Sequence, residues 1–243
     1  MNEGFIAVID SGIGGLSLLT DLIKNFPSER FLYFGDNKNA PYGNKSKREL
    51  ESLTLKNIEY VSSFGVKAIV FACNTISVNI LGNLADRIDI PIFGIFPPVE
   101  SRVMAKEKTL LLCTERTAEH YREVKGVDVV GLPTLVKEIE KNALCLSRFN
   151  AIDVILRNHN GLFIDKKGYY DTVILGCTHF VFIKKQILDH FCPKNIVTGN
   201  DFTVKKLSNY LINKKSLVKY KRFSLLFVGE CAKYNQLIFE KSG

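Results

Sequence analysis

The chain of 243 residues predicts an α/β fold with two pseudo-symmetric, doubly wound parallel-sheet domains and the active site between them. Apolar, β-prone runs alternate with segments of helical spacing along the whole chain. Two of these runs, residues 68–72 and 172–176, are apolar throughout and each is followed by a cysteine and polar residues. Continuous apolar runs are typical of parallel strands buried on both faces. The series restarts after Phe96-Pro97-Pro98, which predicts a boundary between two similar halves.

The first half opens with an apolar strand at residues 5–9, a glycine-rich turn at 10–17 and a helix that ends near Phe26. Leucines and isoleucines at helical spacing predict that helix. Backbone N–H groups in such a turn can bind a small anionic group, although a tight turn without a ligand is the alternative. The remaining elements predicted for this half are strands at 30–34, 68–72 and 91–95 and helices at 46–64 and 76–87.

The second half repeats the alternation of strands and helices. Its predicted strands are 109–113, 127–132, 172–176 and 195–198. Its predicted helices are one that follows residues 114–117 and ends at 124, and those at 134–148, 150–158 and 181–190, with a turn at 158–161. A last strand at 224–228 and a helix to residue 240 are expected to return to the first half. The expected domains are therefore 1–96 with about 211–243, and 97–210.

Composition is that of a globular protein, with 46% hydrophobic and 24% charged residues. No apolar run approaches the ~20 residues that span a bilayer, and no signal peptide is apparent. Six cysteines without C-x-x-C spacing favour a reduced, cytoplasmic setting. The four histidines form no ligand cluster with them, so no metal is expected.

Much of the net charge of +8 comes from residues 202–223, which contain seven basic and no acidic side chains. A solvated basic face and a nucleic-acid patch are the two interpretations. We expect no nucleic-acid partner, since no binding motif accompanies the charge.

The two strand-end cysteines, Cys73 and Cys177, are the main functional candidates. A single buried cysteine is usually structural, but two in matching contexts favour a function. If the halves face each other, a small molecule lies between two thiols, which suits removing a proton from one face of a carbon and returning it on the other. Asn74 and Thr75 are plausible helix N-caps, and a helix N-terminus can lower the pKa of a cysteine from its usual ~8.5.

Removing an amino-acid Cα proton also requires donors for the carboxylate, because negative charge moves onto its oxygens. Ser11, Asn74, Thr75 and Thr178 can supply such donors. Asp10 and His179 are titratable neighbours that could orient a thiol or take its proton. Tyr42, in the Pro-Tyr-Gly loop, either caps a ligand or packs in the core.

Together these motifs resemble those of glutamate racemases, in the same order along nearly the whole chain. The motifs are Asp10-Ser11-Gly-Ile-Gly-Gly-Leu-Ser17, Pro41-Tyr42-Gly43, Ala72-Cys73-Asn74-Thr75 and Gly176-Cys177-Thr178-His179-Phe180. The resemblance implies a cofactor-independent, two-base racemase that interconverts L- and D-glutamate and supplies D-glutamate for peptidoglycan. It also implies two pseudo-symmetric domains, glutamate as the ligand and a homodimer.

On the matching positions, the resemblance implies that Cys73 and Cys177 are the two acid/bases. Asp10 would assist Cys73 and His179 would assist Cys177. Glu140 is the implied functional glutamate, with its neighbour Glu138 as the alternative. The implied substrate-binding residues are Asp10, Ser11, Tyr42, Gly43, Asn74, Thr75, Thr117, Thr178 and His179.

Three positions depart from the family pattern: Val181, where proline is frequent, and Lys137 and Glu138, where apolar residues or proline are typical. These departures affect the expected specificity for the substrate side chain more than the expected type of reaction. The alternatives are an aspartate or other amino-acid racemase, a decarboxylase with a similar enolate, and a binding or regulatory protein on the same scaffold. Retention of both cysteines argues against the last, since binding alone needs no paired thiols.

Overall fold

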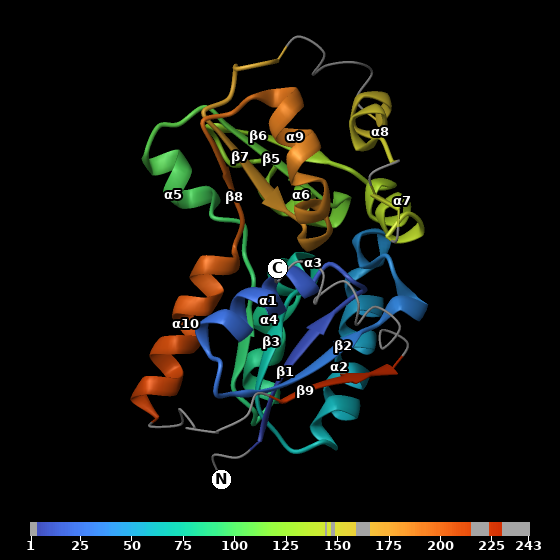
Figure 1. Ribbon diagram of the computed structural model, residues 1–243, viewed down its shortest axis with the longest axis vertical. Coiled ribbons are helices and arrows are strands. Elements are labelled where there is room, and N and C mark those ends of the chain that lie inside the picture. The colour runs from blue at the N-terminus through green and yellow to red at the C-terminus, as the bar shows by residue number, and fades with distance from the viewer. Residues whose placement is uncertain (1–3, 144, 147–148, 159–165, 215–223, 230–243) are drawn as a thin grey trace.

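The computed structural model describes residues 4–143, 145–146, 149–158, 166–214 and 224–229. Within these ranges the chain forms two lobes, each built on one fully parallel sheet (Figure 1). Helices cover both faces of each sheet. The predicted fold class, two doubly wound α/β domains, is therefore confirmed.

The first lobe contains a five-stranded sheet in the order β4-β3-β1-β2-β9. Its strands are β1 (Phe5–Asp10), β2 (Arg30–Gly35), β3 (Val66–Phe71), β4 (Ile92–Gly94) and β9 (Ser224–Val228). Its helices are α1 (Leu16–Asn25), η1 (Asn37–Asn39), η2 (Tyr42–Asn44), α2 (Lys47–Ser62), α3 (Asn74–Asn79), α4 (Leu81–Leu84), η3 (Ala85–Arg87) and α10 (Asn200–Asn213).

The second lobe contains a four-stranded sheet in the order β6-β5-β7-β8. Its strands are β5 (Thr109–Cys113), β6 (Val127–Gly131), β7 (Thr172–Gly176) and β8 (Asn195–Val197). Its helices are α5 (Val99–Met104), α6 (Glu115–Tyr121), α7 (Leu135–Lys141), α8 (Ala151–Asn158), η5 (Thr178–Ile183) and α9 (Lys184–Phe191).

The two sheets share one topology. The order β4-β3-β1-β2 in the first lobe corresponds to β8-β7-β5-β6 in the second. In both lobes the third strand along the chain lies beside the first and leads directly into a cysteine, Cys73 after β3 and Cys177 after β7. The topology thus agrees with the duplication that the sequence indicated.

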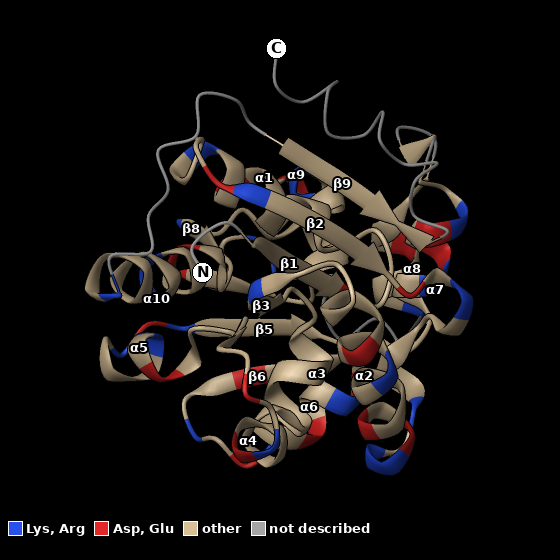
Figure 2. Cartoon of the chain, turned by 90° about the horizontal axis from the view of Figure 1, so that it is seen from below, with Lys and Arg blue, Asp and Glu red and all other residues tan. Residues whose placement is uncertain are grey.

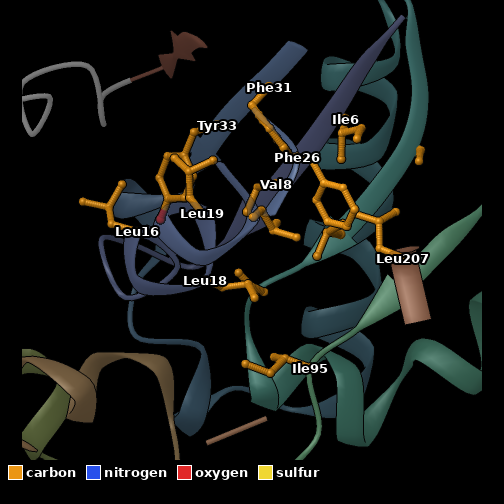
Figure 3. Close-up of a cluster of buried hydrophobic side chains, with 14 of the residues drawn as sticks. Ile6, Val8, Leu16, Leu18, Leu19, Phe26, Phe31, Tyr33, Ile95 and Leu207 are labelled. Atoms are coloured by element: carbon orange, nitrogen blue, oxygen red, sulfur yellow. The ribbon is translucent and has the colours of Figure 1, made fainter. Parts of the chain in front are cut away.

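Alternating side chains of the first sheet divide between two apolar layers, as expected for strands buried on both faces. Ile6, Val8, Phe31 and Tyr33 point toward α1 and α10, where they meet leucines of both helices (Figure 3). Ala7, Ile9, Leu32 and Ile69 face the opposite layer, formed with α2, α3 and α4. The second sheet divides in the same way between α7–α9 and α5–α6.

Helix α10 belongs with the first lobe. Leu207 and Leu211 are fully buried in the same core as α1, and the helix runs along that lobe in Figure 1. We therefore propose that the chain re-enters the first domain near Gly199, earlier than the expected residue 211. The reason is that α10, which precedes β9 along the chain, already packs its apolar face on the first sheet.

Three predicted helices differ in extent. The segment 76–87 is broken into α3, α4 and η3, and the helix expected at 134–148 already ends at Lys141. After Cys177 a 3₁₀ helix, η5, precedes α9. Three predicted segments fall outside the described residues. They are most of the turn at 158–161, most of the basic residues between 214 and 223, and the end of the chain after residue 229.

Charged side chains lie mostly on the outer helices and loops, with both signs present on α2, α5 and α6 (Figure 2). The strands between them are mostly uncharged, as their burial requires. Every helix in the described part of the chain is too short or too polar to cross a bilayer.

Candidate active site

A small cavity lies where the carboxyl ends of the two sheets meet, and it is lined from both lobes. The lining residues are Ser11, Tyr42, Gly43, Cys73, Asn74, Thr75, Thr114, Val136, Cys177, Thr178 and His179. Both cysteines and most of the expected substrate-binding residues are thus brought together. A wider cavity of about 470 Å³ lies elsewhere, near Phe96, His120 and Phe202. We assign the site by its chemistry, because the smaller cavity collects the thiols and their titratable neighbours.

The glycine turn after β1 does not offer the open anion cradle that its sequence suggested. The carboxylate of Asp10 accepts the N–H groups of Gly12 (3.2 Å) and Gly15 (2.9 Å). The N–H of Ile13 donates to Glu140 Oε1 of the second lobe at 2.9 Å. The N–H groups of the turn are therefore occupied by carboxyl groups of the protein itself.

The glycines of this turn allow the second lobe to approach closely. A Cβ at Gly12 would lie 1.9 Å from Glu140 Oε1, and one at Gly14 would lie 2.5 Å from both Thr178 Oγ1 and His179 Nδ1. Such distances are far below van der Waals contact, so a side chain at either position would displace the side chains of Glu140, Thr178 or His179.

Cys73 lies at the N-terminus of α3, as predicted, but it is itself the N-cap residue, and the expected caps Asn74 and Thr75 are the first two residues of the helix. The Cys73 thiol points to Ser11 Oγ at 3.8 Å. The expected lowering of its pKa does not follow. Burial, with a further contribution from the charge of Asp10, raises the pKa of the Cys73 thiol to about 12. A six-residue helix contributes little against the complete loss of solvent around the sulfur.

Asp10 is fully buried behind this thiol. Burial raises the pKa of its carboxyl group, although His179 and the N–H groups of Gly15 and Gly12 act in the opposite direction. Its second oxygen, Oδ1, has no hydrogen-bond partner among the described residues. Asp10 can therefore hold a proton close to the cavity.

Cys177 directly follows β7, and its sulfur lies 3.8 Å from His179 Nδ1. On the other side of the ring, His179 Nε2 donates to Glu140 Oε1 at 2.7 Å. Burial acts to lower the pKa of His179, but hydrogen bonds and charges of Cys177 and Glu140 raise it well above its ordinary value. These contacts favour the protonated form of the ring and place a hydrogen-bonding group beside the Cys177 sulfur.

Glu140 remains ionised in this partly buried position. Burial acts to raise its pKa, but His179, the N–H of Ile13 and the amide of Asn37 more than compensate, so the pKa is lowered. Asn37 Nδ2 donates to Glu140 Oε2 at 3.3 Å. The alternative residue, Glu138, lies on the same helix but pairs with Lys141 at 3.2 Å. Of the two glutamates, Glu140 is thus the one that contacts His179.

Tyr42 and Gly43 line the cavity, but the tyrosine hydroxyl points into the first lobe. It donates to Asp36 Oδ2 at 2.5 Å and accepts from Asn57 Nδ2 at 3.0 Å. Burial and the neighbouring Asp36 carboxylate raise the pKa of Tyr42. The ring of Tyr42 therefore lines the cavity while its hydroxyl is bound elsewhere.

The sequence reasoning missed Thr114, which lines the cavity directly. Its hydroxyl lies 3.0 Å from Thr75 Oγ1 across the two lobes and 3.1 Å from Thr117 Oγ1. Thr117, the predicted residue, lies behind it. The internal duplication could have identified Thr114. It is the first residue after β5, the first strand of the second lobe, just as Ser11 is the first residue after β1 in the first lobe.

Polar contacts between the lobes close the site. Besides the Ile13–Glu140 bond, Asn44 Nδ2 donates to Pro133 O at 3.3 Å and Arg116 Nε donates to Lys45 O at 3.1 Å. The enclosed cavity has a volume of about 10 Å³, which is close to the minimum for one water molecule. An amino acid can enter only after the lobes separate.

Asn74 Oδ1 is buried without a hydrogen-bond partner in the described part of the chain. This acceptor, together with the hydroxyls of Ser11, Thr75 and Thr178, offers polar groups to a small zwitterion. No group of three His, Cys, Asp or Glu side chains among the described residues could hold a metal ion.

Comparison with known proteins identifies relatives along nearly the whole chain. A glutamate racemase of Clostridium botulinum is 34% identical over 239 residues, which cover 91% of this chain and 89% of the relative. One from Campylobacter curvus is 33% identical over 225 residues, with coverage of 85% and 82%. No model of a known protein family matches the chain.

Solved structures agree with these relatives. A glutamate racemase isoform of Bacillus anthracis superposes with a TM-score of 0.82 at 26% identity and covers 100% of this chain and 95% of its own. The glutamate racemase of Thermus thermophilus gives 0.79 at 28% identity, with coverage of 100% and 94%. With this identity to curated relatives and the same two-lobed fold, the chain belongs to the glutamate racemase family of amino-acid isomerases.

Proposed function

We propose that the protein interconverts L- and D-glutamate by a two-cysteine acid/base mechanism without a cofactor. One observation carries the proposal: Cys73 and Cys177 come from opposite lobes and line the same buried cavity. Each thiol has a titratable group near it, Asp10 for Cys73 and His179 for Cys177. Two thiols on opposite sides of one carbon are what proton exchange between its two faces requires.

In this mechanism one cysteine acts as a thiolate and removes the Cα proton, while the other is a thiol and donates a proton to the opposite face. The electron pair of the broken C–H bond moves into the α-carboxylate and returns to Cα when the new C–H bond forms. Hydrogen-bond donors on the carboxylate stabilise the intermediate charge. The family resemblance assigns Cys177 to L-glutamate and Cys73 to D-glutamate.

The proposed substrate-binding set is Asp10, Ser11, Tyr42, Gly43, Asn74, Thr75, Thr114, Thr117, Thr178 and His179. For Tyr42 we propose contact through the ring or backbone, since the hydroxyl is engaged by Asp36 and Asn57. The Thermus thermophilus relative was solved in complex with β-chloro-D-alanine, an amino acid with a reactive side chain. That complex supports an amino-acid ligand for the equivalent site of this chain.

We further propose that the product D-glutamate serves peptidoglycan synthesis and that the enzyme is a cytoplasmic homodimer. The family resemblance supports the first role and the dimer. Cysteine usage supports a reducing compartment, because Cys73, Cys113, Cys145, Cys177 and Cys192 are all free thiols. Nucleic acid is not a proposed partner.

The decisive experiment follows the optical activity of L-glutamate and of D-glutamate in separate reactions with the purified protein. Circular dichroism should decay to zero from both sides without added pyridoxal phosphate, metal or nucleotide. Dialysis against a chelator should leave the rate unchanged. L-aspartate in a parallel reaction tests the closest alternative, and faster turnover of aspartate than of glutamate would overturn the substrate assignment.

A further inference from the structure

We propose that Asp36 and Asn37 are positioning residues, each supporting one of the two half-sites. The proposal rests on the two-cysteine function above. Neither residue lines the cavity, but Asp36 binds Tyr42, which packs with Cys73, and Asn37 binds Glu140, which contacts His179 beside Cys177. Asp36 holds Tyr42 on the Cys73 side, and Asn37 holds Glu140 on the Cys177 side.

Asp36 organises the loop that carries Tyr42 and Gly43. Its backbone N–H donates to Asp10 O at 3.0 Å, which ties the loop to the end of β1. Its carboxylate accepts the Tyr42 hydroxyl at 2.5 Å and the Asn39 amide at 2.9 and 3.0 Å. The side chain is only 5% exposed, so these hydrogen bonds replace nearly all of its hydration.

The Tyr42 anchor determines how the loop meets the cavity. Tyr42 is 1% exposed and packs in the same apolar cluster as Cys73. Gly43 then approaches the second lobe so closely that a Cβ would lie 2.6 Å from Thr114 Cβ. Releasing the Tyr42 hydroxyl would let both residues move, and the wall beside Cys73 would move with them.

Asn37 acts on the other half-site across the lobe boundary. Glu140 Oε1 receives two donors, Ile13 N–H at 2.9 Å and His179 Nε2 at 2.7 Å. Glu140 Oε2 receives Asn37 Nδ2 at 3.3 Å, the one donor that the described residues provide to this oxygen. The amide thereby restrains rotation of the carboxylate, and the carboxylate in turn holds the imidazole ring against Cys177.

The orientation of the Asn37 amide follows from charge. If the amide were turned over, its Oδ1 would face the ionised Glu140 Oε2, and two acceptors would repel each other. The donated hydrogen bond also helps to keep the pKa of Glu140 low. An aspartate at this position would reverse the interaction while conserving the shape of the side chain.

The experiment measures elimination from the two enantiomers of threo-3-chloroglutamate, in which a single thiolate starts the reaction. Removal of the Cα proton expels chloride and leaves the enamine acid. The elimination rate of each enantiomer therefore reports proton removal from one face of Cα only. The Cys73→Ser and Cys177→Ser variants first establish which enantiomer each thiol serves. Asp36→Ala and Asn37→Ala are then compared with Lys38→Ala, an exposed neighbour in the same loop.

We expect Asn37→Ala to lower kcat for the Cys177 enantiomer about tenfold, as loss of one hydrogen bond to a charged group predicts, with less than about a twofold effect on the other enantiomer. Asn37→Asp should be worse than Asn37→Ala, because like charges face each other. Asp36→Ala should instead lower kcat mainly for the enantiomer that Cys73 serves. Asp36→Asn should recover part of the rate, since its Oδ1 still accepts the Tyr42 hydroxyl.

Equal losses for both enantiomers, or an Asn37→Asp variant more active than Asn37→Ala, would overturn the positioning roles and indicate a packing role. Unchanged rates in all four variants would overturn them as well. Far-UV circular dichroism and Tm identify variants that fail to fold, and Tyr42→Phe then replaces Asp36→Ala. Failure of the proposed function itself is distinct, because wild-type protein would then racemise neither enantiomer of glutamate.

Discussion

The two half-sites begin alike and then diverge. In each, a buried parallel strand, β3 or β7, delivers a cysteine to the shared cavity. Cys73 continues into an α-helix and has the buried carboxyl group of Asp10 near it. Cys177 continues into a 3₁₀ turn that brings His179 back against its sulfur at 3.8 Å.

This difference gives the two thiols unlike surroundings. Burial and a neighbouring carboxyl group favour the neutral thiol at Cys73, whereas Cys177 has the imidazole ring of His179 at 3.8 Å from its sulfur. A two-base racemase needs one thiolate and one thiol at the start of each turnover. Duplication thus supplies two equivalent positions, and their different partners supply the asymmetry.

The largest expected effect comes from removing either thiol. Cys73→Ser and Cys177→Ser should each lower racemisation in both directions by about 10³-fold, because a serine hydroxyl is a far weaker acid/base. With threo-3-chloroglutamate the two variants should retain elimination from opposite enantiomers. Chiral chromatography of the remaining substrate measures this. Cys145→Ser, at an exposed position, is the control, and loss of the same enantiomer in both variants would refute the comparison.

Removing the partner of each thiol should have the next largest effect. We expect His179→Asn to slow elimination from the Cys177 enantiomer by about 10²-fold and Asp10→Asn to slow the Cys73 enantiomer to a smaller extent. The histidine effect is larger because His179 lies 3.8 Å from the Cys177 sulfur, whereas the Cys73 thiol points to Ser11 rather than to Asp10. Steady-state kcat/KM for each enantiomer gives the ratio. If both variants reduce both enantiomers equally, the partners are not specific to one face.

Elimination from the enantiomer that Cys73 serves should depend steeply on pH. Since the pKa of Cys73 is about 12, its thiolate fraction rises about tenfold per pH unit between about pH 7 and 10. Elimination from its enantiomer, measured as kcat/KM, should rise accordingly. A profile for this enantiomer that stays level over the same range would contradict the raised pKa of Cys73.

The smallest expected effect is on stability. Glu140→Gln should lower the free energy of unfolding by about 2 kcal/mol, or roughly 5 °C in Tm. Glu138→Gln, two residues earlier on α7 and paired with Lys141, should change it by less than about 0.5 kcal/mol. Thermal unfolding followed by circular dichroism compares the two variants. Equal losses of stability would show that the contacts of Glu140 with Ile13 and His179 contribute no more than a surface ion pair.

This stability difference should depend on pH in a defined direction. The pKa of Glu140 is lowered, so its contribution is complete above its ordinary value of 4.5 and is lost as pH falls through the folded value. The pKa of His179 is raised, so its contribution is complete below its ordinary value of 6.5 and is lost as pH rises through the folded value. The gap between wild type and Glu140→Gln should therefore be widest between pH 4.5 and 6.5.

Local sequence determined the strands, the parallel sheets and the positions of both cysteines. An apolar run has to be buried wherever it lies, so its pattern alone identifies a strand. The residue after such a strand reaches the carboxyl edge of the sheet whatever the other lobe does. That is why Cys73, Asn74, Cys177 and Thr178 could be expected together before the structure was known.

Contacts between distant residues were decided by the packing of the lobes. The choice between Glu138 and Glu140 depends on which face of α7 meets the glycine turn, and the sequence near either glutamate does not specify that. The carboxyl groups of Asp10 and Glu140 accept the N–H groups of the glycine turn, and the Tyr42 hydroxyl points to Asp36 and Asn57. Both arrangements depend on how the folded chain places these partners. Burial likewise reversed the expected pKa shift of Cys73, because desolvation is a property of the whole fold and exceeds the effect of one short helix.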